Sequence, residues 1–117
     1  IVWIQTDISN SSQNLASRGY DNIGNNAMLA ANPVTGEVKR FMTGPRGCEI
    51  TGVTMTPDQR TMFVNIQHPG ESTKMADVAD PAKYQSQWPA NAGYGAGQRP
   101  RSATIVITKN DGGVIGS

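Results

Sequence analysis

The sequence feature that most constrains the fold is a pair of alternating apolar patterns on either side of a tight turn. In residues 53–55 and 62–66, apolar side chains alternate with Thr, Phe or Asn, which is the period of two expected of β-strands. Between them, Pro57 pre-sets the backbone φ angle of a turn, and Asp58 can accept hydrogen bonds from nearby backbone groups. The stretch therefore predicts an antiparallel hairpin.

Similar patterns along the rest of the chain predict an all-β fold. The segments 8–26 and 68–101 are rich in Gly, Pro, Ser or Asn and are expected to be loops. A helical tendency exists only around residues 80–88, where Pro81 would occupy the first turn, so we expect almost no helix outside residues 76–88. The expected antiparallel strands lie near residues 2–6, 27–31, 37–43, 50–56, 61–67 and 103–108.

A weak internal repeat of strand, long loop, strand, short turn and strand indicates β-propeller blades. Residues 28–38, which include a turn at Gly36, match residues 105–115, which include a turn at Gly113. Since a blade has four antiparallel strands, the repeat predicts an incomplete three-stranded blade in residues 1–43. It predicts a following four-stranded blade in residues 44–117, interrupted by the long loop 68–101. A β-sandwich could produce similar strands, so the repeat alone leaves both folds open.

Composition excludes several partners and structures. The 117 residues suffice for one domain, and ten basic against nine acidic residues, without runs of either sign, argue against nucleic acid or an anionic membrane as partner. A single cysteine excludes an internal disulfide. No apolar run approaches the about 20 residues that span a bilayer. Because the sequence opens within a strand pattern, without a signal peptide, we expect a fragment of a larger protein.

The blade prediction places the long loops at one end of the molecule. In a propeller, the loops between blades and those joining the second and third strands of a blade emerge on the same face. Here these loops would be residues 7–26, 43–49 and 68–101, and the other face would carry only tight turns. A ligand site is therefore expected at the rim that the long loops form.

Four segments of the sequence resemble a known family. They are WIQTD, NNAMLAANPVTGEVKRF, GPRGCEITGVTMTPDQRTMFVNIQHPGE and RPRSATIVITKNDGGVIGS. Together they resemble the C-terminal part of the PhoX-type alkaline phosphatases. The resemblance implies that the intact protein is one large propeller that hydrolyses phosphomonoesters, with calcium and ferric iron held in its central channel. It also implies that the protein is periplasmic or secreted.

Glu49 is the strongest candidate for a functional residue. It stands where a loop enters the predicted innermost strand, between Gly47 and Gly52, which allow close approach of the backbone to other groups. Hard cations such as calcium and ferric iron prefer carboxylate oxygens and polarise phosphoryl oxygens. The family's G-x-E-x-T-G pattern matches residues 47–52, so the resemblance implies that Glu49 is a metal ligand. The residues alone also allow the alternative that Glu49 is an ordinary glutamate at the start of a strand, solvated or paired with an arginine.

Arg46 and His68 are the candidate catalytic residues. The guanidinium of Arg46, in the loop before Glu49, has the geometry to bind a phosphate, although the sequence by itself favours an ordinary exposed arginine. His68, the only histidine, follows a predicted strand at its loop-facing end. It could act as a phosphate-binding cation or general acid, or it could order its loop through a hydrogen bond to a backbone carbonyl.

Other residues near this rim could bind a ligand or could serve only the structure. Cys48 is interpreted as a buried structural thiol, because a nucleophilic cysteine needs a partnered base. Asp7 and Glu71 could be calcium ligands or turn caps. Trp88 and Tyr94 could form the wall of a pocket or anchor the long loop.

Two functions from different classes remain at this point. The chain could be part of a metal-dependent phosphatase that binds a phosphomonoester substrate and is inactive by itself, or it could be a non-catalytic propeller module for binding or structure. The G-x-E-x-T-G pattern favours the phosphatase. In isolation, the chain is expected to self-associate through exposed strand edges.

Overall fold

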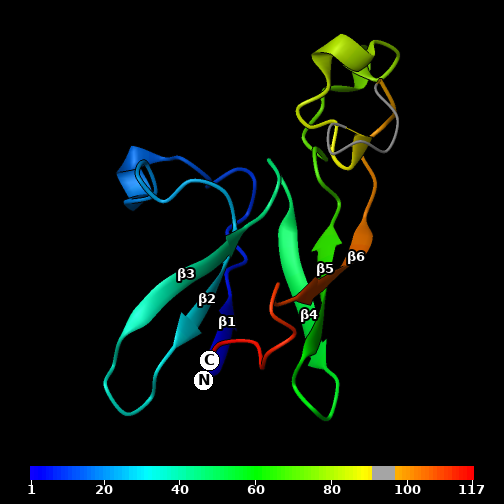
Figure 1. The fold of residues 1–117 in the computed structure, drawn as a ribbon. Helices are drawn as coiled ribbons and strands as arrows, with labels where there is room; N and C mark the ends of the chain where they lie inside the picture. The colour runs from blue at the N-terminus through cyan, green and yellow to red at the C-terminus, as the bar shows by residue number, and fades with distance from the viewer. Residues whose placement is uncertain (91–96) are drawn as a thin grey trace.

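A computed structural model describes residues 1–90 and 97–117 and consists of two antiparallel three-stranded sheets (Figure 1). The first sheet has the order β1 (Val2–Gln5), β2 (Ala27–Ala31) and β3 (Val38–Thr43). The second has the order β4 (Glu49–Met55), β5 (Thr61–Gln67) and β6 (Ala103–Thr108). All six expected strands are present, with ends displaced by at most one residue, and the described residues contain no α-helix. The all-β prediction is confirmed.

The predicted hairpin is formed by β4 and β5. Its turn is fixed by Asp58, whose Oδ1 accepts hydrogen bonds from the Thr56 hydroxyl at 2.6 Å and from the Arg60 backbone N–H at 3.2 Å. These two hydrogen bonds, the one from Thr56 above all, lower the pKa of the Asp58 carboxyl. The register that follows pairs Met55 with Met62 near the turn and Glu49 with Gln67 at the other end. Local turn chemistry thus determines which residues meet at the loop-facing end.

Three short 3-10 helices lie in the long loops of the described residues. They are η1 (Ala16–Arg18), η2 (Met75–Asp77) and η3 (Pro81–Lys83). The last begins as expected, with Pro81 in the first turn and the Asp80 side chain accepting a hydrogen bond from the Ala82 N–H at 3.1 Å. The first lies outside residues 76–88, in a segment expected to be loop throughout. Among these residues, no helix has the length and apolarity to cross a membrane.

The prediction of a fourth strand in the second blade, after the turn at Gly113, is wrong. Val114 and Ile115 do not pair with β6; they lie across the β4–β5 turn. There the Arg60 guanidinium donates to the Gly112 carbonyl at 2.9 Å, and the Ile115 N–H donates to the Gln59 carbonyl at 3.0 Å. Ile115 is thereby buried in the core with 5% of its surface exposed. Burial of this side chain between the sheets replaces strand pairing.

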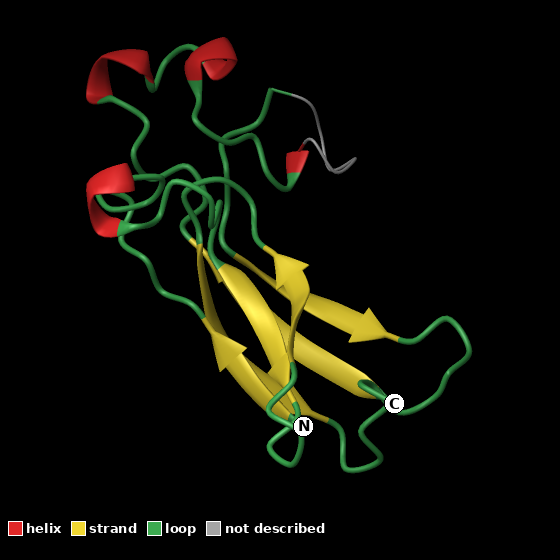
Figure 2. Ribbon diagram, turned by 90° about the vertical axis from the view of Figure 1, so that its left-hand side faces the viewer, coloured by secondary structure: helices red, strands yellow, loops and turns green. Residues whose placement is uncertain are grey.

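The core lies between the two sheets, whose arrangement is drawn in Figure 2, and buried side chains of both sheets form one apolar cluster. Met28 of β2 belongs to the same buried cluster as Met62 and Val64 of β5, and all three side chains are fully buried. Beside this cluster, the rings of Trp3 and Phe41 pack edge to face with centroids 4.8 Å apart. Face-to-face packing of antiparallel sheets is the arrangement expected of neighbouring propeller blades.

The long loops gather at one end of the molecule and the tight turns at the other (Figure 1). The loop after β1, the β3–β4 connection and the loop between β5 and β6 all lie at the end where β4 begins. The turns after β2, β4 and β6 lie at the opposite end, where Arg60 joins two of them. The rim predicted from the sequence is therefore formed as expected.

The isolated 117-residue chain is predicted to self-associate. β1 and β6 each have one edge without a partner among the described strands, and these strands expose large apolar side chains. Val2 is 48% exposed, Ile4 40% and Val106 61%. Unpaired edges beside apolar surface favour pairing with other chains. Light scattering of the purified chain should give a mass well above that of one molecule; a stable monomer at high concentration would contradict this prediction.

Candidate functional site at the loop-facing rim

Glu49 is the first residue of β4 and lies at the loop-facing end of the hairpin. Its side chain is 29% exposed, so the carboxylate is accessible. A register shift in β4 follows it at Gly52, which has a φ of 48°. This left-handed backbone conformation favours glycine, and an added Cβ would also lie 2.7 Å from the side-chain Nδ2 of Asn65, which would have to move.

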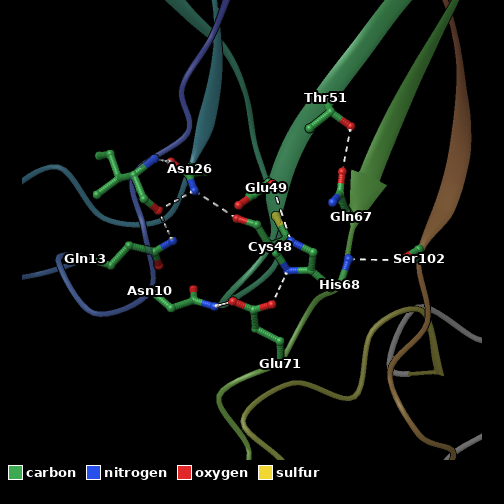
Figure 3. A network of polar contacts seen from close by, with 11 residues as sticks. Asn10, Gln13, Asn26, Cys48, Glu49, Thr51, Gln67, His68, Glu71 and Ser102 are labelled. Carbon is green, nitrogen blue, oxygen red and sulfur yellow. Dashed lines mark hydrogen bonds and ion pairs between the residues drawn. The ribbon is translucent and has the colours of Figure 1, made fainter.

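His68 lies between two carboxylates (Figure 3). Its φ of 34° and the hydrogen bond from its backbone N–H to the Ser102 hydroxyl, 2.8 Å, fix the start of the loop. Its Nε2 is 3.3 Å from Oε2 of Glu49, and its Nδ1 is 2.9 Å from Oε2 of Glu71. Nδ1 is buried and has no hydrogen-bond partner of good geometry among the described residues, so the approach of Glu71 is a close contact and not an in-line hydrogen bond.

Glu71 connects this cluster to the other sheet. The Asn10 side chain, in the loop after β1, donates a hydrogen bond from Nδ2 to Oε1 of Glu71 at 2.6 Å. Asn10, Glu71, His68 and Glu49 therefore form a continuous polar chain across the rim (Figure 3). The sequence left open that His68 orders its loop through a hydrogen bond to a backbone carbonyl. In the structure, the two ring nitrogens contact the carboxylates of Glu49 and Glu71 instead.

Arg46 is exposed, and its guanidinium makes no hydrogen bond or ion pair with the described residues. Its backbone is fixed, however, because the Arg46 carbonyl accepts a hydrogen bond from the Gly70 N–H at 3.0 Å. Gly47 has a φ of 72°, and a Cβ there would lie 3.2 Å from the Gly70 nitrogen. The loop before β4 is thus held against the loop after β5, while the Arg46 side chain is exposed to solvent and accessible to a ligand.

Cys48 is a buried structural thiol, as predicted. It is 1% exposed and belongs to the apolar core cluster between the sheets. Burial raises the pKa of its thiol from an ordinary 9.0 to about 11. A thiol held neutral in the core is a poor nucleophile and a poor metal ligand.

This burial predicts that Cys48 is inert toward a disulfide reagent in the folded protein at pH 8. Reaction should require unfolding, because the reagent needs an accessible thiolate. Since folding raises the thiol's pKa, its contribution to stability is complete below pH 9 and is lost as the pH rises toward about 11. Comparing thiol labelling with and without denaturant checks this, and rapid stoichiometric labelling of the native protein would contradict it.

Asp7 and Trp88 are not brought into the polar cluster. Asp7 is exposed and its carboxylate makes no hydrogen bond with the described residues. Trp88 packs against the core cluster, and its carbonyl accepts a hydrogen bond from the Arg101 N–H at 3.1 Å, so Trp88 anchors the long loop. Tyr94 lies outside the described residues.

The carboxylate oxygens at the rim are the kind of ligand that calcium prefers, but they are too few to hold it. In the part of the chain that the structure describes, no group of three or more His, Cys, Asp or Glu residues is arranged to bind a metal ion. Glu49 and Glu71 offer accessible carboxylate oxygens, which calcium prefers, but calcium takes about six to eight oxygen ligands. Cys48 does not fit iron, because its thiol is buried and held neutral.

Two asparagines at the rim were not predicted from the sequence. Asn10 binds Glu71, and Asn26 is fully buried and binds the Cys48 carbonyl. Both lie within the Asn- and Ser-rich segment 8–26, where asparagine is expected to form ordinary turns. Composition carries no signal that separates a buried, fully bonded asparagine from a solvated one.

Comparison with known proteins connects this geometry to a family. None of the curated proteins compared matches the chain. The solved structure of Pseudomonas fluorescens PhoX in complex with vanadate, a transition state analogue, is 43% identical with a TM-score of 0.74. The match covers 97% of this chain and 17% of that one, so the chain spans about a sixth of its relative's length. The profile of the family described as alkaline phosphatase PhoX matches residues 1–70, and the chain belongs to the PhoX alkaline phosphatase family.

Proposed function

We propose that this chain is part of a metal-dependent phosphatase that hydrolyses phosphate monoesters. The observation that carries the proposal is the position of Glu49, a partly exposed carboxylate at the loop-facing end of β4, in a member of an alkaline phosphatase family. The relative solved with vanadate supports a site for a phosphoryl group in the parent protein. Because the chain spans only 17% of that relative, the activity is assigned to the parent and not to these residues alone.

Glu49 would hold a calcium ion in the parent. Once bound, such a cation polarises a phosphoryl oxygen and offsets the negative charge that develops during hydrolysis. His68 would orient the Glu49 carboxylate through its 3.3 Å contact, while Glu71 and Asn10 hold the other side of the imidazole ring. Most of the remaining ligands of calcium, and the ligands of iron, would come from residues outside this chain. Iron, and a periplasmic or secreted location, rest on the family resemblance.

A phosphatase assay on the full-length parent tests this function. With p-nitrophenyl phosphate as substrate, we expect hydrolysis that is abolished by a calcium chelator and restored by added calcium. The isolated 117-residue chain should be inactive, because one or two carboxylates cannot hold the metal by themselves. Hydrolysis by the parent that is unaffected by chelation, or its complete absence with metals supplied, would contradict the proposal.

Arg46 would bind the phosphate oxygens of the substrate. Replacing it by Ala in the parent is expected to raise KM about 10-fold to 100-fold, since a hydrogen bond to a charged group contributes about 1.5–3 kcal/mol. Steady-state kinetics measures this. The matched control is Arg60→Ala at the opposite end, where the guanidinium bonds the Gly112 carbonyl. An unchanged KM in Arg46→Ala, or an equal rise in both variants, would contradict this role.

A further inference from the structure

Asn26 is fully buried at the loop-facing end of the first sheet, immediately before β2. Its Oδ1 accepts hydrogen bonds from the Ile8 N–H at 2.7 Å and from the Thr6 hydroxyl at 3.0 Å. Its Nδ2 donates to the Ile8 carbonyl at 2.9 Å and to the Cys48 carbonyl at 2.9 Å. A carboxamide has two acceptor positions and two donors, and here every one of them is used.

The backbone of Asn26 binds the same loop from its other end. The Asn26 carbonyl accepts a hydrogen bond from the Gly44 N–H at 2.8 Å. Asn26 therefore holds both Gly44 and Cys48, the two ends of the loop that carries Arg46 and leads directly into Glu49. Figure 3 shows the Asn26 side chain joined to the Cys48 carbonyl beside the Glu49 and His68 cluster.

We propose that Asn26 is a positioning residue that places the Glu49 carboxylate for cation binding. The Cys48 carbonyl and the Glu49 nitrogen belong to one planar peptide unit, so a movement of that carbonyl moves the Glu49 backbone with it. The carbonyl lies at a buried contact, where water does not replace a lost donor. The inference rests on the proposed role of Glu49 as a calcium ligand, and it identifies a residue at the end of the first sheet that would control the position of a metal ligand in the second sheet.

The substitution Asn26→Asp separates positioning from packing. Aspartate has nearly the same shape, and it can still accept from the Ile8 N–H and the Thr6 hydroxyl. It lacks the two donors, so its carboxylate would face the carbonyl oxygens of Ile8 and Cys48. Repulsion should move the Cys48 carbonyl and, with it, Glu49.

The experiment uses the full-length parent and two readouts of calcium. One is the calcium concentration that gives half-maximal hydrolysis of p-nitrophenyl phosphate, and the other is the rise in Tm that saturating calcium produces. Since removing a residue that orients a metal ligand weakens the site roughly 10–100-fold, Asn26→Asp should raise the half-maximal concentration by that factor. The calcium-induced rise in Tm, measured at a fixed calcium concentration that saturates the unsubstituted protein, should shrink correspondingly.

The matched control is Asn32→Ala. Asn32 also accepts a backbone hydrogen bond, from the Val34 N–H at 2.9 Å, but in the turn at the opposite end. Its loss should lower the Tm of the calcium-free protein while leaving both calcium readouts unchanged. A purely structural role for Asn26 would give the same pattern in Asn26→Asp, and that result would overturn the proposal.

A second variant keeps the proposal testable if Asn26→Asp does not fold. Thr6→Val keeps the shape of Thr6 but removes one hydrogen bond to Oδ1 of Asn26 and the acceptor of the Ala27 N–H, so it should raise the half-maximal calcium concentration to a smaller degree. Unchanged calcium readouts in Thr6→Val would then overturn the proposal. Failure of the underlying function looks different, because hydrolysis by the unsubstituted parent would then show no calcium dependence at all.

Discussion

Replacement of Glu49 by Gln in the full-length parent is expected to lower kcat by about 100-fold to 1,000-fold, with little change in Tm. Glutamine has the size of glutamate but lacks the negative charge that a calcium ligand supplies. The effect on stability should be small because the Glu49 side chain is 29% exposed and its contact with His68, at 3.3 Å, is not an in-line hydrogen bond. Initial rates with p-nitrophenyl phosphate at saturating calcium measure the loss.

The control for this substitution is Glu37→Gln, which makes the same chemical change at the opposite end of the molecule. Glu37 is exposed and its carboxylate lies 3.0 Å from the Lys39 ammonium, a surface pair whose loss should leave kcat unchanged. Near-normal activity in Glu49→Gln would refute its assignment as the functional carboxylate. So would an equal loss in both variants.

Gly70→Ala is expected to produce a large loss of stability at the rim. Gly70 has a φ of 72°, and an added Cβ would lie 3.1 Å from both N and Cβ of Ser86 and 3.2 Å from Cγ of Pro100. None of these atoms can rotate away, because one belongs to the backbone, one is bonded directly to it and one belongs to the proline ring. Left-handed strain of roughly 1–2 kcal/mol and overpacking of roughly 1–3 kcal/mol should together lower the free energy of unfolding by roughly 2–5 kcal/mol.

Gly36→Ala isolates the strain from the packing. Gly36 has nearly the same φ, 73°, but a Cβ there would meet nothing within 4 Å, so only the strain of roughly 1–2 kcal/mol should appear. Denaturant titration of the two variants in the parent gives the comparison. Activity should fall in Gly70→Ala alone, because the Gly70 N–H binds the carbonyl of Arg46. Equal destabilisation by the two substitutions would contradict the predicted close packing around Gly70.

The strands were predictable because their signal is local. Alternation in β5, which buries Met62, Val64 and Ile66, identifies the strand and its inward face together. The sequence pattern also predicted a strand at Ile115, and this was wrong. The apolar side chain of Ile115 fills the core near Gln59 and does not extend the second sheet. Whether an apolar residue joins a strand or fills a gap between sheets depends on partners distant in sequence, and a local pattern does not contain them.

The candidate site was predictable in part. Glu49 and His68 were both placed at the loop-facing rim, since each adjoins the end of a strand of one hairpin, and the structure brings them together. Asn26 reaches Cys48 across 22 positions of sequence, and Asn10 reaches Glu71 across 61. These contacts arise only when the two sheets pack against each other. The proposed metal-ligand role of Glu49 came from a family pattern, whereas the hydrogen bond from Asn26 to the Cys48 carbonyl, next to Glu49, follows only from the fold.

Anomalous diffraction from crystals of the full-length parent, grown with calcium, tests most directly whether Glu49 is a metal ligand. We expect an anomalous peak at an ordinary calcium–oxygen distance, about 2.3–2.6 Å, from a carboxylate oxygen of Glu49. Metal peaks that all lie elsewhere, with the Glu49 carboxylate in contact only with His68, would contradict the account.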